Sequence, residues 1–399
     1  MGSTGNKART VIVAGGGIGG LAACIGFSRA GYQVVVLEKA QEFGEIGAGI
    51  QLAPNAFPPM KILGIAERAL ANAVYIDRLV MMDAVSGEQI AEIPLGDAFK
   101  QHFRNPYVVI HRADLHSPLL EACRADPKVT LLAGHEVMGF EQIGDEVEVT
   151  TANGASFRGC ALLGADGVRS RIREDIVGDG GPKISGHVAY RAVLPIEEMP
   201  EQLRWNAAAL WAGPKCHFVH YPLRGRKLFN IVATFHSDQY TTELHNEPGD
   251  REELLARFEH LPPLPRSVLE KSDGWRRWVL GDRDPVENWS RGNVTLLGDA
   301  AHVTYQYFAQ GAVMALEDSV CLMREVMQAD GDLPAAFLRY QEQRITRTAR
   351  IVLSSRAIGQ YFYHPAGVER LVRNQMLGSK TPEDFFRGLD WIYGYGRDS

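Results

Sequence analysis

The sequence of 399 residues has no excess of positive charge. Lys and Arg number 42 against 48 Asp and Glu, so the formal net charge is −6. Proteins that bind nucleic acid usually carry clustered and dominant basic residues, so this balance argues against that class. The chain also has no internal repeat and no low-complexity tract. With 45% hydrophobic and 23% charged residues, its composition is typical of a globular protein, and its length predicts two or three domains at about 150 residues each.

Cysteine is scarce and scattered. The five cysteines are odd in number, and no two of them have CxxC spacing. The sequence therefore predicts neither a zinc site nor a disulfide framework, and we expect no metal site. A reducing, cytoplasmic setting is the natural expectation.

Long apolar runs are few, and only residues 11–27 resemble a signal peptide or a membrane segment. They follow Lys7 and Arg9, but six of the 17 residues are glycine, and no cleavage pattern of small residues is present. A buried strand that leads into a glycine-rich turn explains the segment better. We therefore expect no integral membrane segment.

A β-α-β unit is predicted over the first thirty residues of the fold. Residues 10–14 form the continuous apolar run of a parallel strand that is buried on both faces. A helix is predicted over residues 21–30 and a second strand over residues 33–37. The turn between the first strand and the helix contains Gly15, Gly17 and Gly20 in the pattern GxGxxG.

These glycines have separate roles in a dinucleotide site. Gly15 permits the tight turn, Gly17 lets a pyrophosphate approach the backbone, and Gly20 lets the helix pack closely on the strand, while the helix N-terminus donates N–H groups to the phosphates. Glu38 ends the second strand 18 residues after Gly20, where it can accept both hydroxyls of an adenosine ribose. Because Glu38 would repel a 2′-phosphate, the pattern predicts FAD or NAD rather than NADP.

Further strands are predicted at residues 107–111, 129–132, 146–151, 161–165 and 294–297. Residues 186–278 differ, because they hold long strands with hairpin signals at residues 216–221 and 228–236, followed by a polar, proline-containing stretch at residues 246–265. Helical apolar spacing covers residues 311–329 and 333–363. The fold class predicted is α/β with an α+β insert: a Rossmann-like FAD-binding domain, an inserted antiparallel-sheet substrate domain and a helical C-terminal segment.

Three further motifs separate FAD from NAD. They are Gly164-Ala165-Asp166-Gly167-Val168-Arg169-Ser170-x-x-Arg173, Leu297-Gly298-Asp299-Ala300-Ala301-His302 and His111-Arg112-x-x-Leu115. With the glycine turn, they resemble the motifs of the single-component FAD-dependent aromatic hydroxylases, which are flavoprotein monooxygenases. The resemblance covers essentially the whole chain. It is greatest to the 3-hydroxybenzoate 6-hydroxylases, and the salicylate and 6-hydroxynicotinate hydroxylases are more distant.

The resemblance implies a set of cofactor-binding residues. Asp299 would bind the ribityl or pyrophosphate part of FAD, Arg112 would neutralise the diphosphate, Asp166 would lie near the pyrophosphate and Arg169 near the approach of the nicotinamide. The helix that begins at Gly311 would direct its free N–H groups at the pyrimidine edge of the flavin. The full set is Gly15, Gly17, Gly20, Glu38, Lys39, Arg112, Asp166, Arg169, Asp299, Gly311, Ala312 and Val313.

The implied domains are an FAD-binding domain in three segments (9–78, 101–185 and 279–355), substrate-domain strands at 79–100, a substrate domain at 186–278 and a C-terminal helical segment at 356–399, which is the candidate for a homodimer contact. No second GxGxxG is present, so NADH or NADPH is expected to dock transiently as a co-substrate. The implied reaction uses O2: NAD(P)H reduces FAD, and a C4a-hydroperoxyflavin hydroxylates a phenolic acid. For 3-hydroxybenzoate, attack para to the hydroxyl gives 2,5-dihydroxybenzoate (gentisate).

A hydroxylating flavin needs an activated phenol, for which a histidine near its ordinary pKa is suited. His217 and Tyr221 lie four apart on a predicted strand and so share a face, whereas His220 lies on the opposite face. The resemblance places His217, Tyr221 and Gln306 in the substrate pocket, and we predict that His217 and Gln306 handle the phenol oxygen. His302 is expected to hold the loop after the flavin motif.

The residue that binds the substrate carboxylate is left open at this stage. Arg191 and Arg224 are candidates, and hydroxyl or amide donors are the alternative.

Two features depart from the family pattern. Val303 replaces a common proline beside the reacting edge of the flavin, which frees the backbone there, and Phe57-Pro58-Pro59 interrupts a usually continuous helix.

Three alternative functions stay open. They are a decarboxylating hydroxylase of the salicylate or 6-hydroxynicotinate type, a flavin dehydrogenase that yields only peroxide, and a non-catalytic carrier on the same fold.

Overall fold

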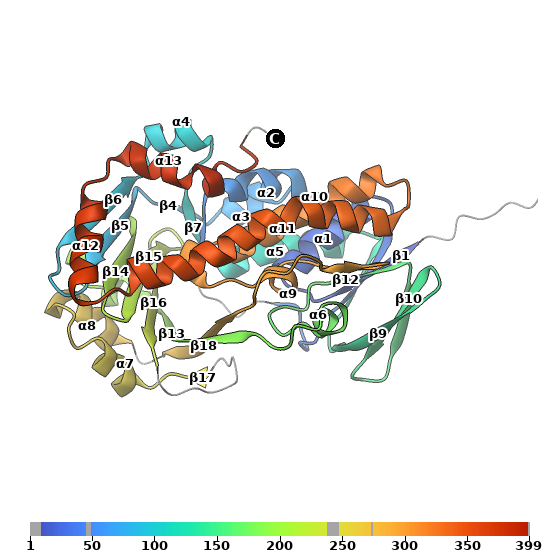
Figure 1. Ribbon diagram of the computed structural model, residues 1–399, viewed down its shortest axis with the longest axis horizontal. Helices are drawn as coiled ribbons and strands as arrows, with labels where there is room; N and C mark the ends of the chain where they lie inside the picture. Colours follow the sequence, from blue (N-terminus) through green and yellow to red (C-terminus); the bar gives the residue numbers. More distant parts are fainter. Residues whose placement is uncertain (1–8, 45–48, 238–246, 273, 398–399) are drawn as a thin grey trace, which may run out of the picture.

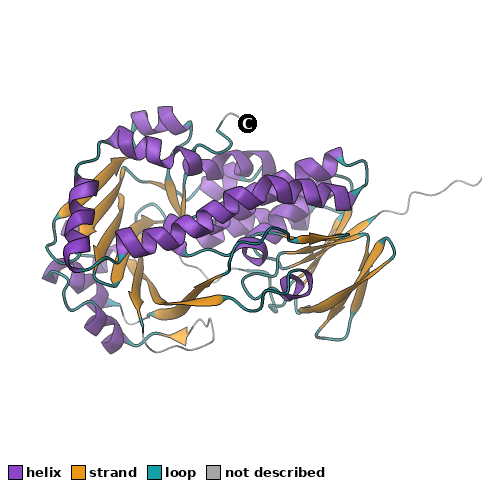
Figure 2. Cartoon of the chain, in the orientation of Figure 1, coloured by secondary structure: helices purple, strands orange, loops and turns teal. Residues whose placement is uncertain are grey.

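The computed structural model describes residues 9–44, 49–237, 247–272 and 274–397. Two large sheets lie at opposite ends of the molecule, and the long helix α11 (Leu333–Ile358) runs between them (Figure 1). Most helices lie along the upper side of the molecule in this view, while α7 (Arg251–Arg257) and α8 (Pro263–Lys271) lie at the lower left beside the antiparallel sheet (Figure 1 and Figure 2). The predicted class, α/β with an antiparallel-sheet insert and C-terminal helices, is confirmed.

The first sheet has the parallel core that the apolar runs predict. Its strand order is β19 (Ser290–Arg291), β20 (Val294–Leu296), β12 (Ala161–Gly164), β1 (Thr10–Ala14), β2 (Gln33–Leu37) and β8 (Val129–Leu132). All neighbours pair in parallel except β19 and β20. α1 (Ile18–Arg29) and α5 (Arg112–Ala125) pack against this sheet, and α10 (Gly311–Gln328) packs on α1. Strands β10 (Glu146–Thr151) and β11 (Ser156–Gly159) of a smaller sheet contact β12 and β1, and the core strands are buried.

The second sheet has eight strands and is antiparallel apart from one pair. Its order is β17 (Glu247–Pro248), β18 (Arg276–Asp282), β13 (Lys183–Pro195), β16 (Leu228–His236), β15 (Cys216–Leu223), β14 (Ala207–Gly213), β5 (Arg78–Asp83) and β6 (Gln89–Pro94). Three strands have the bounds predicted from the sequence. They are β16 of this sheet (228–236), β8 of the parallel sheet (129–132) and β10 of a smaller sheet (146–151). β5 and β6 come from a distant part of the sequence and extend the sheet through the parallel pairing of β5 with β14.

The other strands form two smaller sheets. One has the order β11 (Ser156–Gly159), β10 (Glu146–Thr151) and β9 (Val137–Ile143), and the other β3 (Gly49–Leu52), β7 (Val108–His111) and β4 (Val74–Tyr75).

The polar, proline-containing stretch at residues 246–265 includes α7 (Arg251–Arg257) and the start of α8 (Pro263–Lys271). The Asp250 side chain caps α7 by accepting hydrogen bonds from the backbone N–H groups of Glu252 and Glu253. Phe57-Pro58-Pro59, which are expected to interrupt a helix, directly follow the short 3-10 helix η1 (Pro54–Ala56). These residues start α2 (Phe57–Leu63), where the missing proline N–H groups have no helical partner to lose.

The remaining helices are α3 (Ala66–Leu70), α4 (Asp97–Phe103), α6 (Arg171–Ile176), α9 (Asp299–His302), α12 (Gly367–Gly378) and α13 (Pro382–Tyr393). α12 and α13 lie beside β6 at the end of the antiparallel sheet (Figure 1). α12 leaves Val368, Leu371, Val372 and Met376 exposed, and the homodimer contact in this segment stays a prediction. Within the described ranges, no helix is both long and apolar enough to cross a bilayer.

Candidate active site

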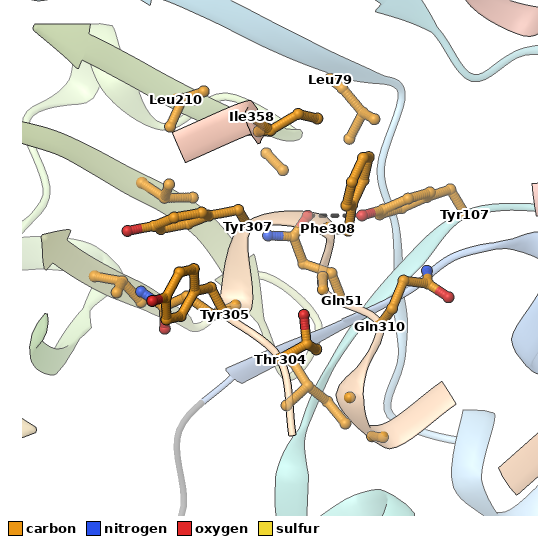
Figure 3. Close-up of a pocket in the computed structure, with 18 of the residues that line it drawn as sticks. Gln51, Leu79, Tyr107, Leu210, Thr304, Tyr305, Tyr307, Phe308, Gln310 and Ile358 are labelled. Atoms are coloured by element: carbon orange, nitrogen blue, oxygen red, sulfur yellow. Dashed lines mark hydrogen bonds between the residues drawn. The ribbon is translucent and has the colours of Figure 1, made fainter. Parts of the chain in front are cut away.

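A cavity of about 730 Å³ extends between the glycine turn of the parallel sheet and one face of the antiparallel sheet. Its size is within the usual range for sites that hold small molecules and cofactors. Loop residues 304–312 form the wall between these two parts, and several of their side chains point into the cavity together with Leu79, Leu210 and Ile358 (Figure 3). Tyr107 donates a hydrogen bond of 2.8 Å to Gln51 on the wall (Figure 3).

The structure brings together eight of the fifteen site residues predicted from the sequence. Residues Gly17, Arg112, His217, Tyr221, Asp299, Gln306, Gly311 and Ala312 all line this one cavity.

The glycine turn has the geometry that the pattern predicts. Gly15 has a φ of +107°, and a Cβ there would lie 2.2 Å from the carbonyl oxygen of Ala165, while a Cβ on Gly20 would lie 1.9 Å from the carbonyl oxygen of Gly15. A Cβ on Gly17 would meet no protein atom within 4 Å, and Gly17 faces the cavity. Gly15 and Gly20 therefore allow backbone segments to approach each other closely, and Gly17 leaves space for a ligand.

Two helix N-termini reach the cavity without a side chain to cap them. Gly17, which has no side chain, is the N-cap of α1, and Gln310 is the N-cap of α10, where its side chain accepts no capping hydrogen bond. Such ends present N–H donors and a partial positive charge. Together with the guanidinium of Arg112 and the carboxylate of Asp299 on the wall, these groups fit the diphosphate, the hydroxyls and the flavin ring of FAD.

Glu38 lies at the end of β2, as predicted. Its carboxylate accepts hydrogen bonds from the backbone N–H groups of Gly16 (2.7 Å) and Ala40 (2.8 Å). It thus ties the glycine turn to β2, and each oxygen retains a lone pair for a ribose hydroxyl.

Some predicted cofactor residues do not form the cavity wall. The Asp166 carboxylate points toward α6, where it accepts hydrogen bonds from the Ser170 hydroxyl (2.6 Å) and the Arg171 N–H (2.9 Å). The backbone of Ala165 and Gly167 on either side lines the cavity instead. Lys39 and Arg169 are exposed outside the wall, and the roles of these three side chains toward a cofactor stay predictions. The Val313 side chain packs in the core, so only its backbone is available to a ligand.

His217 and Tyr221 share the face of β15 that lines the cavity, and His220 lies on the other face. His220 is fully buried against Phe218 and Phe229. Burial raises the pKa of Tyr221 far above its ordinary value, so its hydroxyl stays protonated and can donate. The face assignment made from the period of two is confirmed.

The pKa of His217 differs from the expectation. Burial, with a further contribution from His187, lowers the pKa of His217 from 6.5 to about 3. The ring is therefore neutral near pH 7. Its Nδ1 lies 2.7 Å from Nε2 of His364, which leaves Nε2 of His217 for a ligand in the cavity.

Gln306 and Arg191 form a second polar group on the same wall. The Gln306 amide oxygen accepts a hydrogen bond from Arg191, and its nitrogen donates to the Thr234 hydroxyl at 3.0 Å. Arg191 lies opposite Val232 in the sheet register and His217 lies opposite Thr234, so both side chains share the cavity face.

Arg191 is the arginine that fits a substrate carboxylate. Burial lowers the pKa of its guanidinium. Its Nε has no hydrogen-bond partner, and it pairs with no carboxylate in the part of the chain that the structure describes. It lies over the ring of Trp278, 5.4 Å from the centroid. Arg224 lies outside the cavity wall and pairs with Asp114 at 3.5 Å.

The loop after the second flavin motif is held by a contact between His302 and Asp318 of α10. His302 is buried and its Nε2 lies 2.6 Å from Asp318, so it holds the loop as expected. Val303 has φ −52° and ψ 136°, which are values that proline also adopts. Val303 therefore holds the backbone in a conformation that the family's proline could also adopt, and the greater freedom of the backbone at this position stays a prediction.

Sequence reasoning missed His364, which follows the π-helical turn η5 (Gly359–Tyr363) and contacts His217 from 147 residues away. It also missed Tyr307 of η4 (Gln306–Phe308), whose ring lies 5.3 Å from that of His217. No periodicity or motif links positions so distant in sequence.

Comparison with known proteins agrees with this geometry. Residues 8–355 match the family model described as FAD binding domain. The chain is 50% identical to the 3-hydroxybenzoate 6-hydroxylase of Polaromonas naphthalenivorans (strain CJ2), over 96% of each chain, and 49% identical to that of Klebsiella oxytoca, over 98% of each. A crystal structure of an HpxO variant from Klebsiella pneumoniae in complex with FAD has a TM-score of 0.85 at 25% identity, over 97% of this chain and 99% of the other. This chain therefore belongs to the FAD-binding family and, within it, to the flavoprotein aromatic hydroxylases.

Proposed function

We propose that the protein hydroxylates 3-hydroxybenzoate at position 6 and forms 2,5-dihydroxybenzoate, with FAD, NAD(P)H and O2. One observation carries the proposal: a single cavity wall presents a neutral histidine for the phenol and, for the acid, a half-buried arginine that has no carboxylate partner among the described residues. The names of relatives that are about half identical over nearly the full chain support the same substrate. Position 6 is para to the hydroxyl, where a phenolate concentrates electron density.

Arg191 orients the substrate in this scheme. A carboxylate beside its guanidinium neutralises a half-buried cation and accepts strong charge-assisted hydrogen bonds. The bond from Arg191 to Gln306 ties this anchor to the residue that we place next to the phenol oxygen.

His217 and Gln306 act on the phenol. Nε2 of His217 accepts the phenol proton, and the Gln306 amide, held by Thr234, donates a hydrogen bond to the resulting oxygen. Tyr221 stays protonated and supplies a further donor on this face. The ring is thereby activated before oxygen reaches it.

FAD, when bound, supplies the redox and oxygen chemistry. The glycine turn, Arg112, Asp299 and the α10 N-terminus would hold it at one end of the cavity. Aromatic side chains from loop 304–308 cover the substrate end (Figure 3) and exclude water from it. No second dinucleotide fold is found in the residues the structure describes, so NADH or NADPH docks transiently.

The test is oxidation of NADH and of NADPH by the FAD-loaded protein with 3-hydroxybenzoate, salicylate or 6-hydroxynicotinate, with products identified by mass and NMR. We expect 3-hydroxybenzoate to stimulate oxidation strongly and to gain one oxygen at position 6. Hydroxylation of salicylate with loss of CO2 would instead establish a decarboxylating enzyme. Peroxide alone with all three acids would contradict the proposed substrate, and a protein that takes up no FAD would point to a carrier.

A further inference from the structure

Four histidines from distant parts of the sequence lie in a row beside the cavity. His217 of β15, His187 of β13 and His236 of β16 share one face of the sheet, since His187 pairs with His236 and His217 pairs with Thr234. His364 follows η5 and packs on the same face. Ring centroids are 4.9 Å apart for His217 and His364, 4.7 Å for His364 and His187, and 5.7 Å for His187 and His236.

Exposure increases along this row. The side of the row at the cavity is buried, with His217 at 2% and His364 at 9% of their full exposure. His187 and His236 are only partly buried. The row therefore leads from the substrate wall toward solvent.

The first contact in the row is a hydrogen bond between two imidazoles. Nδ1 of His217 lies 2.7 Å from Nε2 of His364. With the proton of His217 on Nδ1, its Nε2 faces the cavity as an acceptor. Nδ1 of His364 is buried and has no hydrogen-bond partner among the residues that the structure describes, so no protein acceptor holds a proton on that nitrogen.

His217 is poorly suited to keep the proton that it takes. Burial lowers its pKa to about 3 and that of His187 to about 4, and burial together with the neighbouring histidines lowers the pKa of His364 well below 6.5. A protonated ring is thus costly at each buried position. A base in this place needs an acceptor to which it can pass the charge.

The titratable groups that face His364 come from every element packed around it. They are His187 of β13, His217 of β15, His236 of β16, Tyr307 of η4 and Tyr363 of η5, which directly precedes His364. Arg373 of α12 lies beside the turn through its bond to the carbonyl of Phe362, and the backbone N–H of Lys215 donates to the carbonyl of His364. The Tyr307 hydroxyl lies 3.0 Å from Nδ1 of His187. None of these groups is a carboxylate that would trap the proton.

We propose that His364 relays the phenol proton from His217 toward solvent, and this step rests on the proposed function because it needs a phenolic substrate. The phenol O–H bond breaks as Nε2–H of His217 forms, and the Nδ1–H bond of His217 breaks as Nε2–H of His364 forms. His217 ends neutral, with its proton on Nε2, and His364 ends cationic. His364 then loses its Nδ1 proton to solvent water, which accepts it at the partly exposed end of the row beside His187 and His236 and becomes hydronium. It acts through His217, so it is a positioning residue that does not touch the substrate.

The test follows ionisation of a phenol in the FAD-loaded protein. 3-Hydroxy-4-nitrobenzoate is the probe, because its phenolate is coloured, and a stopped-flow pH jump measures the rate at which the bound phenolate forms. The key variant is His364→Asn, whose amide oxygen can still accept the hydrogen bond from His217 but cannot carry a proton. We expect the probe's affinity to be retained, the rate of ionisation to fall about tenfold or more, and the solvent deuterium isotope effect to rise.

The controls separate the possible failures. His220→Asn changes the same strand on the opposite face, and its ionisation rate should match that of the wild type. If His364→Asn loses FAD, His364→Gln is measured in its place, since it has the same amide acceptor on a longer side chain. An unchanged ionisation rate and isotope effect in a variant that binds the probe would overturn the relay. Failure of the wild type to bind the probe would instead count against the proposed function.

Discussion

Arg191 offers the sharpest test of how the cavity recognises an acid. Arg191 is half-buried with its Nε fully buried, contacts Gln306 and Trp278, and pairs with no carboxylate among the described residues. We consider Arg191→Met, which keeps an apolar stem of similar reach and removes every donor. The variant should bind 3-hydroxybenzoate weakly and unfold no more easily than the wild type.

The expected size follows from the interaction lost. A hydrogen bond to a charged group contributes about 1.5–3 kcal/mol, so loss of this anchor weakens binding about 10- to 150-fold. The stability of the apoprotein should change in the opposite direction, because a cation that is removed from water without a carboxylate partner destabilises the fold. Its free energy of unfolding should therefore equal or exceed that of the wild type.

The assay is a titration of the FAD-loaded protein, followed by the change in flavin absorbance on binding. 3-Hydroxybenzyl alcohol serves as the neutral ligand, and its affinity should change little. Arg224→Gln is the matched control, because Arg224 lies outside the cavity wall in a half-exposed pair with Asp114. Equal losses for the acid and the alcohol, or unchanged affinity for the acid, would refute the carboxylate assignment.

Three more predictions concern the base, its strand and the cofactor turn. His217→Ala should keep FAD and lose about 10²- to 10⁴-fold in hydroxylation rate, and unchanged turnover would remove it as the base. Burial lowers the pKa of His220 from 6.5 to about 3, so below pH 6.5 the unfolded chain binds a proton that the folded chain does not. Stability is then lost as pH falls toward 3, by about 2 kcal/mol at pH 5. His220→Phe should remove this part of the slope in urea unfolding at pH 7 and pH 5, and an unchanged slope would contradict the burial argument. Gly17→Ala should leave apoprotein stability unchanged and weaken FAD binding, whereas Gly20→Ala should fail to fold, since its Cβ would lie 1.9 Å from the carbonyl oxygen of Gly15. Wild-type FAD affinity in Gly17→Ala would place the diphosphate elsewhere.

Local patterns in the sequence predicted much of the site. The period of two separated His217 from His220, because side chains alternate across a strand regardless of what packs on it. The glycine pattern predicted the turn, since Gly15 needs a positive φ and Gly20 leaves no space for a Cβ. These features depend on a few neighbouring residues.

Long-range packing was beyond such reasoning. The contact of His217 with His364 joins residues 147 positions apart, and the low pKa of His217 comes from burial that only the assembled cavity creates. Arg191 and Arg224 were equivalent candidates in the sequence. Their environments separate them, since one is half-buried on the cavity wall and the other pairs with Asp114 near the surface.

The most direct test of the central claim is a reaction of the FAD-loaded protein with NADH, 3-hydroxybenzoate and 18O2. The account predicts 2,5-dihydroxybenzoate in which one 18O atom is bonded to the carbon that was position 6 of the substrate. Peroxide without labelled product, or a label at another ring carbon, would contradict it.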